Sequence, residues 1–251
     1  MTAFDLDGDD AGLGVVLLHG FTGTPYEVRY LGEQLARAGF AVRAPLLPGH
    51  GTSLADLDRT TWRDWAAHVD RAIEAVAARG RRVAVVGQSL GGLLALHAAS
   101  LRPQVEAVAT LAAPVWLEGL SARVASWAER GLLPVRAIPK LGGSDVRDRR
   151  VRAENPCYPA IPVKALGELC AFMRVADAAL PRITQPVLVL HAHKDHTAPV
   201  ACATHIAERT RARRLRILPR SYHLIAADVE RDIVAAEVIG FLRKGGTACA
   251  T

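Results

Sequence analysis

Residues 83–92 read Val-Ala-Val-Val-Gly-Gln-Ser-Leu-Gly-Gly, and this stretch decides the fold that we predict for the whole chain. Its first half is an apolar run, which is typical of a strand buried on both faces of a parallel sheet. A G-x-S-x-G turn centred on Ser89 follows, and an Ala/Leu-rich helix comes next. A serine on such a turn has a strained backbone, and the flanking glycines leave room for it. We therefore predict that Ser89 is a nucleophile at the carboxyl end of its strand, although an ordinary structural turn has the same pattern.

Strand-like and helix-like patterns alternate on both sides of this stretch. Short apolar runs predict further strands at 15–18, 40–44, 105–112, 186–191 and 214–218. Apolar residues at helical spacing predict helices from the Thr24-Pro25 pair onward and over 62–76, 90–98, 200–209 and 225–242. This alternation predicts an α/β fold, with a mostly parallel sheet flanked by helices on both faces.

The alternation stops between residues 114 and 182. This segment is too apolar for a linker and too long for an ordinary loop, and prolines and glycines break it into helix-like stretches. We predict an inserted small helical cap, or lid, over the carboxyl edge of the sheet, with residues 1–113 and 183–251 forming the core domain. Asp145 and Asp148 lie in this insertion amid arginines, and we expect them to pair with those arginines at the surface.

The composition argues against a nucleic-acid partner. The chain of 251 residues carries a net charge of +6, with a pI of about 9.5. Its arginines are spread along the sequence, and the denser groups at 147–152 and 209–216 lack interleaved aromatic residues. We therefore interpret the excess of positive charge as a solvated basic surface.

The sequence predicts no metal site, no cofactor and no membrane-spanning segment. Its four cysteines, at 157, 170, 202 and 249, form no C-x-x-C pair and no ligand-like spacing with histidine. The first ten residues lack the basic and apolar regions of a signal peptide. Apolar runs are too short to cross a bilayer. The expected location is cytoplasmic.

A nucleophilic serine needs partners that the predicted sheet can supply. At neutral pH its hydroxyl requires a neighbouring imidazole, which in turn requires a carboxylate to fix its tautomer. The loops that follow parallel strands open on one edge of the sheet. Asp195 follows the strand 186–191 and His223 follows the strand 214–218. We therefore expect both side chains to converge on Ser89.

Five motifs occupy the predicted loops. They read LLHGFTG at 17–23, PGHG at 48–51, GQSLGG at 87–92, DHTAP at 195–199 and SYH at 221–223. Together they resemble the α/β-hydrolase superfamily, whose triad has the same order of Ser, Asp and His along the chain. The resemblance extends from residue 15 to residue 242 and is strongest to small bacterial carboxylesterases and monoacylglycerol lipases. It implies a serine hydrolase that cleaves short- to medium-chain acyl esters or monoacylglycerols, with a small-molecule ester as substrate.

The resemblance also implies a role for each residue of the site. By it, Ser89 is the nucleophile, His223 is the general base and acid, and Asp195 is the orienting carboxylate. The backbone amides of Phe21 and Leu90 are the oxyanion hole.

Other side chains near these motifs have less certain roles. The family often has glycine before the catalytic histidine, where this chain has Tyr222, and this difference leaves the size of the substrate open. His50 is expected to be a structural or pocket-lining residue that bonds loop backbone, and His191 is expected to be structural. His193 and His196 flank Asp195 and could line the mouth of the site or bind a metal, and we favour no metal.

Other functions share the triad or the fold. Thioesterases, C–C bond hydrolases and perhydrolases use the same arrangement, so motifs do not exclude them. A non-catalytic ligand-binding member of the fold is a further alternative. It is disfavoured because a binding protein has no need of an activated nucleophile.

Overall fold

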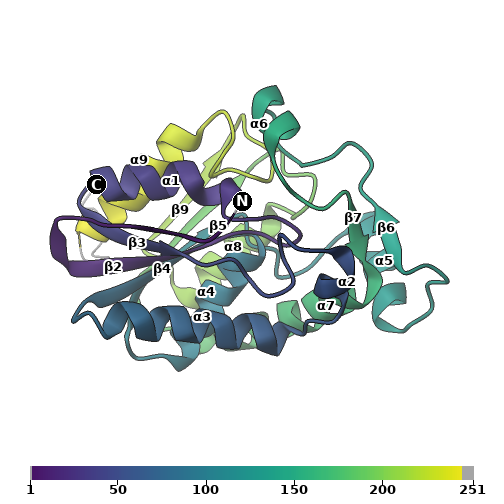
Figure 1. Ribbon diagram of the computed structural model, residues 1–251, viewed down its shortest axis with the longest axis horizontal. Helices are drawn as coiled ribbons and strands as arrows, with labels where there is room; N and C mark the ends of the chain where they lie inside the picture. Colours follow the sequence, from purple (N-terminus) through teal and green to yellow (C-terminus); the bar gives the residue numbers. More distant parts are fainter. Residues whose placement is uncertain (1, 245–251) are drawn as a thin grey trace.

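A computed structural model describes residues 2–244, and it has the predicted α/β architecture (Figure 1). Seven strands form the main sheet: β1 (Phe4–Leu6), β2 (Asp10–Leu18), β3 (Phe40–Ala44), β4 (Arg82–Gln88), β5 (Val105–Leu111), β8 (Val187–Ala192) and β9 (Arg214–Leu218). Their order across the sheet is β1-β3-β2-β4-β5-β8-β9. Only β1 is antiparallel to its neighbour, β3, among these strands. The predicted, mostly parallel sheet is confirmed.

Helices cover both faces of the sheet (Figure 1). Those outside the insertion are α1 (Tyr26–Arg37), α2 (Leu54–Asp58), α3 (Trp62–Ala77), α4 (Leu90–Leu101), α8 (Ala201–Thr210) and α9 (Arg231–Arg243). Along β4, Val83 and Val85 pack into the core on the side of α3, α4 and α8, whereas Ala84 and Val86 pack on the side of α1 and α9. This alternation explains why residues 83–86 of β4 are all apolar. None of the helices within residues 2–244 is long and apolar enough to span a membrane.

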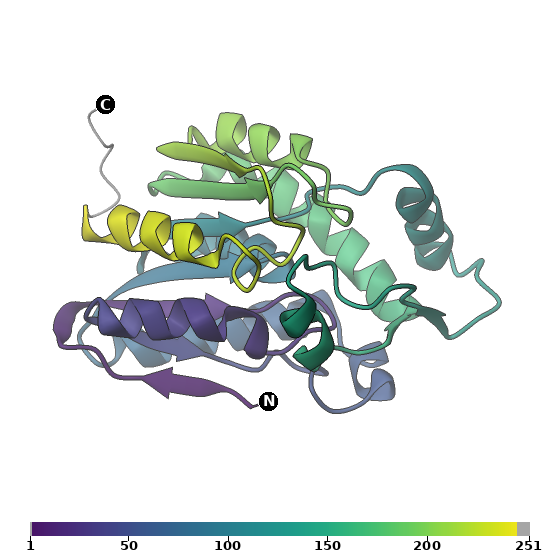
Figure 2. The ribbon, with the colours of Figure 1, turned by 90° about the horizontal axis from the view of Figure 1, so that it is seen from above.

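The insertion between β5 and β8 contains more than short helices. It comprises α5 (Gly119–Glu129), β6 (Ala137–Pro139), α6 (Arg149–Glu154), β7 (Ala160–Pro162), α7 (Val163–Ala179) and a 3-10 turn (Leu180–Arg182). The two strands pair with each other antiparallel, with Ile138 opposite Ile161. Proline is compatible with such short edge strands because one side of each makes no ladder bond. Figure 2 shows α5, α6 and the β6–β7 pair beyond one end of the main sheet. In contrast, the buried Phe172 and Met173 of α7 join the α4 side of the core.

Two helices begin later than the sequence patterns predict. Pro25 is the N-cap residue of α1 rather than its first residue, and the Thr24 hydroxyl accepts a long, 3.4 Å hydrogen bond from the Tyr26 amide. The last helix begins at Arg231 and not near residue 225. Residues 224–227 are buried and Val229 is exposed. Asp228 and Glu230 accept hydrogen bonds from preceding backbone amides, which holds this segment in turns.

The turn after β4 has the strained geometry predicted from its sequence. Ser89 has φ 56° and ψ −116°, a backbone conformation that residues other than glycine rarely adopt. A Cβ atom at Gly87 would lie 2.0 Å from the carbonyl oxygen of Gly91, and one at Gly91 would lie 2.5 Å from that of Leu18. Both glycines are therefore required by close backbone contacts.

Replacing Gly87 by alanine is expected to lower the free energy of unfolding by about 3 kcal/mol, because the added methyl group overlaps backbone that cannot rotate away. Gly240→Ala is the matched control. That position lies in α9 with open space around it, and alanine there should raise stability by about 0.5–1 kcal/mol through helix propensity. Urea unfolding monitored by circular dichroism measures both. Equal stabilities for the two variants would contradict the crowding of the turn.

Candidate active site

Three loops at one edge of the sheet bring the predicted residues together. Ser89 follows β4, Asp195 follows β8 and His223 follows β9. His223 Nε2 lies 2.9 Å from Ser89 Oγ, and His223 Nδ1 lies 2.8 Å from Asp195 Oδ2. Ser89 and His223 are nearly buried, and the Asp195 side chain is fully buried. This geometry allows a proton to pass from the hydroxyl to an imidazole whose other nitrogen is held by a carboxylate.

The surroundings of Asp195 keep its carboxylate ionised and fixed in orientation. Oδ1 accepts hydrogen bonds from the Thr197 amide at 2.8 Å and the Ala198 amide at 2.7 Å. Oδ2 faces His223 and also lies 3.2 Å from His191 Nε2. Burial by itself raises the pKa of this carboxyl, but the two histidines outweigh burial and hold the pKa well below its usual range. His191, predicted to be structural, thus also contacts the candidate triad.

Nearby anions favour the protonated form of His223. Burial by itself lowers the pKa of this imidazole, whereas the charges of Asp195, Asp145 and Glu27 raise it, and the net shift is upward. Gln88 fixes the backbone of the same loop. Its amide nitrogen donates to the His223 carbonyl at 2.9 Å, and its carbonyl accepts from the Ala226 amide at 3.3 Å. The residue before the serine therefore supports the histidine.

Two backbone amides beside Ser89 are available for an oxyanion. Within the described residues, neither the Phe21 amide nor the Leu90 amide donates a hydrogen bond. Leu90 is the first residue of α4, where helical N–H groups have no partner in the helix. Phe21 lies in a tight loop that the Gly23 amide closes with a 3.2 Å bond to the Gly20 carbonyl. Both predicted donors thus have free N–H groups.

A buried carboxylate supports that loop and was missed by sequence reasoning. Glu27 Oε2 accepts the Gly20 amide at 3.0 Å, and the Glu27 carboxylate leaves no room for a Cβ atom at Gly23. Burial raises the pKa of Glu27. The signal was present in the sequence, because Glu27 occupies the same helical stripe as the core residues Leu31 and Leu35.

The histidines of the first loops have structural roles. His19 Nδ1 donates to the Gly20 carbonyl at 2.9 Å, and its Nε2 accepts the Leu47 amide at 3.1 Å. His50 packs edge-on against Phe21, and burial lowers the pKa of His50 to about 4. As predicted, His50 bonds loop backbone, since its Nδ1 donates to the Pro48 carbonyl at 3.0 Å.

A cavity of about 630 Å³ lies above Ser89. Core residues of the three loops form its floor, and the insertion forms most of its walls. Most of the apolar lining comes from the insertion: Leu117, Leu120, Val124, Ile138, Leu141, Ile161, Leu166, Leu169 and Met173. Polar residues also line the cavity, including Glu27, Lys140, Asp145, Arg152 and Tyr222. The cavity therefore offers both apolar and polar contacts to a bound molecule.

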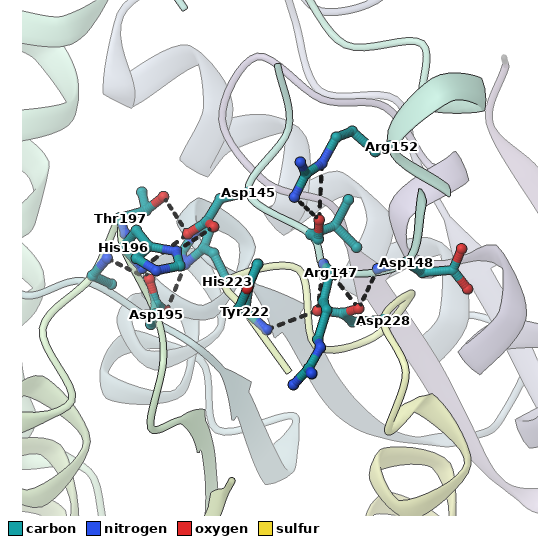
Figure 3. Close-up of polar contacts among 12 residues, drawn as sticks. Asp145, Arg147, Asp148, Arg152, Asp195, His196, Thr197, Tyr222, His223 and Asp228 are labelled. Carbon is teal, nitrogen blue, oxygen red and sulfur yellow. Dashed lines mark hydrogen bonds and ion pairs between the residues drawn. The ribbon is translucent and has the colours of Figure 1, made fainter. Parts of the chain in front are cut away.

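The predicted surface pairing of the two insertion aspartates is wrong. Asp145 instead contacts His196 and Thr197 in the loop after β8 (Figure 3). Asp148 caps α6 by accepting the amides of Arg150 and Val151. Sequence proximity to arginine was a poor guide, because a capping carboxylate satisfies helical N–H groups and Asp145 reaches donors from a distant loop.

His193 and His196 lie in the exposed part of the loop after β8. Within residues 2–244, no group of three histidine, cysteine or acidic side chains is arranged to hold a metal ion. His193 is exposed, and His196 packs edge-on against Tyr222 with ring centroids 4.6 Å apart. Cys157, Cys170 and Cys202 are free thiols, and Cys249 lies outside the described residues.

Comparisons with known proteins agree with this geometry. The sequence is 32% identical over 234 residues to a thermostable monoacylglycerol lipase of a Bacillus species, covering 92% of this chain and 91% of that one. It is 31% identical over 242 residues to a carboxylesterase of Bacillus subtilis, covering 94% of each. A solved structure from work on LipS and LipT, two metagenome-derived lipolytic enzymes, superposes with a TM-score of 0.88 at 28% identity and covers 97% of each chain.

A second solved structure and a family model agree with these similarities. The structure, a monoacylglycerol lipase of Paleococcus ferrophilus, is 22% identical and shares the fold with a TM-score of 0.80 over 98% of this chain. The model described as "Serine aminopeptidase, S33" matches residues 11–230, which is most of the sequence. With this match and the two Bacillus relatives, the chain belongs to the serine aminopeptidase S33 family of α/β-hydrolases.

Proposed function

We propose that this protein is a serine hydrolase that cleaves carboxylic esters through an acyl-enzyme intermediate. The observation that carries the proposal is the hydrogen-bonded series from Ser89 through His223 to Asp195, at 2.9 Å and 2.8 Å, on the floor of a large cavity. The relatives named monoacylglycerol lipase and carboxylesterase support an ester as the substrate.

Each proposed step uses a group already in position. Ser89 Oγ attacks the ester carbonyl while His223 Nε2 takes its proton. The amides of Phe21 and Leu90 stabilise the oxyanion. The C–O bond to the alcohol then breaks, and the alcohol leaves with the proton from His223. Water attacks the acyl-enzyme by the same route, with His223 again as the base, and releases the acid.

The insertion, residues 114–182, acts in this proposal as a cap that binds the acyl chain. Its apolar residues on α5, α7 and β6 face the cavity. Each methylene buried there contributes up to about 0.8 kcal/mol, which is about fourfold in kcat/KM. For a series of p-nitrophenyl esters, kcat/KM is therefore expected to rise from acetate to octanoate. A maximum at acetate would contradict an acyl role for this wall.

The pH dependence of kcat/KM should show the raised pKa of His223. Only the neutral imidazole accepts the serine proton, so activity is lost as the pH falls through that pKa. Because Asp195, Asp145 and Glu27 raise it, the acidic limb should lie above about 6.5, the ordinary value for histidine. A pH–rate profile with a neutral ester measures this limb, and a midpoint well below 6 would contradict the assignment.

A fluorophosphonate probe tests the proposed function directly. The probe should label Ser89, as mapped by mass spectrometry of the peptide, and block hydrolysis of p-nitrophenyl butyrate in proportion to labelling. An unlabelled protein would be a non-catalytic binder. Parallel assays with a monoacylglycerol, an acyl-CoA and an aminoacyl p-nitroanilide separate an esterase from a thioesterase and from the aminopeptidase named in the family description.

A further inference from the structure

We propose that Asp145, a residue of the insertion, is a positioning residue for the triad, because it ties together the two loops that carry Asp195 and His223. The proposal rests on the triad assigned under Proposed function. It concerns two segments, the acid loop (residues 193–200, after β8) and the histidine loop (residues 219–230, after β9).

The carboxylate of Asp145 binds the acid loop next to the triad aspartate. Its Oδ1 accepts His196 Nδ1 at 2.8 Å, and its Oδ2 accepts the His196 amide at 3.0 Å and the Thr197 hydroxyl at 3.1 Å (Figure 3). Thr197 in turn donates its amide to Asp195 Oδ1. Asp145 thus acts on Asp195 through His196 and Thr197, the two residues that follow Asp195.

The backbone of Asp145 binds the histidine loop. Its carbonyl oxygen accepts the Leu224 amide at 3.1 Å, immediately after His223. A single residue of the insertion therefore contacts a neighbour of Asp195 and a neighbour of His223, although the two loops come from different strands. The 2.8 Å bond between Asp195 and His223 depends on the relative position of these loops.

A second carboxylate fixes the segment on which Asp145 lies. Asp228 is fully buried, and it accepts the amides of Arg147 and Asp148 from the insertion at 2.9–3.0 Å (Figure 3). It also accepts the Tyr222 amide of the histidine loop at 2.7 Å. Residues 145–148 are thus bonded to the core on both sides. This part of the insertion belongs mechanically to the triad rather than to the acyl-binding wall.

The expected consequence of losing this tie is a loss of kcat with little change in KM. A displacement of about 1 Å between reacting groups costs on the order of 10²-fold in rate, whereas the apolar wall that binds the acyl chain is untouched. Asp145→Ala removes both carboxylate oxygens and with them the three hydrogen bonds to the acid loop. Asp145→Asn can keep three hydrogen bonds, since its oxygen can accept the His196 amide and the Thr197 hydroxyl while its NH₂ group donates to His196 Nδ1 in the tautomer with the proton on Nε2.

The test compares these variants in kcat, KM and the rate of fluorophosphonate labelling. Asp145→Ala should lower kcat and the labelling rate by on the order of 10-fold to 10²-fold, with KM changed less than about threefold. Asp145→Asn should restore most of kcat and move the acidic limb of the pH–rate profile to lower pH, because one of the three anions facing His223 is lost, with Asp195 and Glu27 remaining. Glu154→Ala, on α6 of the insertion and with side-chain bonds to Arg150 and Tyr26 rather than to either loop, is the matched control and should behave as wild type.

Wild-type kcat and labelling rate in Asp145→Ala would overturn the proposal. If that variant does not fold, Thr197→Val tests the proposal instead. It removes one of the three hydrogen bonds to the partly exposed Asp145 carboxylate and should lower kcat a few-fold. An unchanged kcat in Thr197→Val would then overturn the proposal. Labelling of the wild-type protein separates the two hypotheses. An unlabelled wild-type protein contradicts the proposed function, whereas a labelled wild-type protein with equal rates in all variants contradicts only the role of Asp145.

Discussion

Replacement of Ser89 by alanine is expected to lower kcat for p-nitrophenyl butyrate by about 10⁵-fold or more. Among the described residues, the Ser89 hydroxyl is the only group to which His223 Nε2 makes a hydrogen bond, at 2.9 Å. No second nucleophile is therefore in position to form the acyl-enzyme. Removing the nucleophile from a serine triad leaves only the contributions of binding and of the oxyanion donors. The Ser89→Ala variant should also show no fluorophosphonate labelling.

The control for this variant is Ser100→Ala. Ser100 lies at the opposite end of the same helix, α4, and its hydroxyl donates to the His97 carbonyl at 2.8 Å. Its loss should leave kcat unchanged. Retention of more than about 1% of wild-type kcat in Ser89→Ala, after removal of contaminating esterases, would show that another residue attacks the ester.

Much of the fold was predictable because the signals are local. The apolar run at 83–86, the glycine-flanked turn and the alternation of strands and helices each depend on neighbouring residues, and the structure has the sheet they predict. The positions of Asp195 and His223 also followed from topology, since loops after parallel strands share one edge. The order of the residues along the chain and the direction of the strands were sufficient.

The contacts that support the site were not predictable in the same way. Asp145 bonds to His196, 51 residues away, and Asp228 bonds to Arg147, 81 residues away. No periodicity relates such pairs, so the neighbouring arginines led to the wrong partner for Asp145. The β6–β7 pair was missed for a related reason. Each strand has only three residues, which is too short for an alternating pattern to be distinguished from a loop.

Asp195→Asn is expected to lower kcat by on the order of 10⁴-fold, and the structure explains why the amide would adopt the damaging orientation. The amides of Thr197 and Ala198 both donate to Oδ1, so they would retain the oxygen of an asparagine on that side. Its NH₂ group would then face His223 Nδ1. A donor at this place requires Nδ1 to be an acceptor, which puts the proton on Nε2 and leaves no base for Ser89.

The matched control is Asp177→Asn. Asp177 also accepts a hydrogen bond from a histidine, with its Oδ1 2.6 Å from His205 Nε2. That pair lies outside the cavity, so the substitution should not change kcat. The pH–rate profile distinguishes a wrong tautomer from a simple loss of charge. Loss of charge alone would lower the pKa of His223 and leave a normal plateau at high pH, whereas a wrong tautomer lowers the plateau itself. A plateau within about tenfold of wild type would therefore contradict the role assigned to Asp195 in fixing the proton of His223.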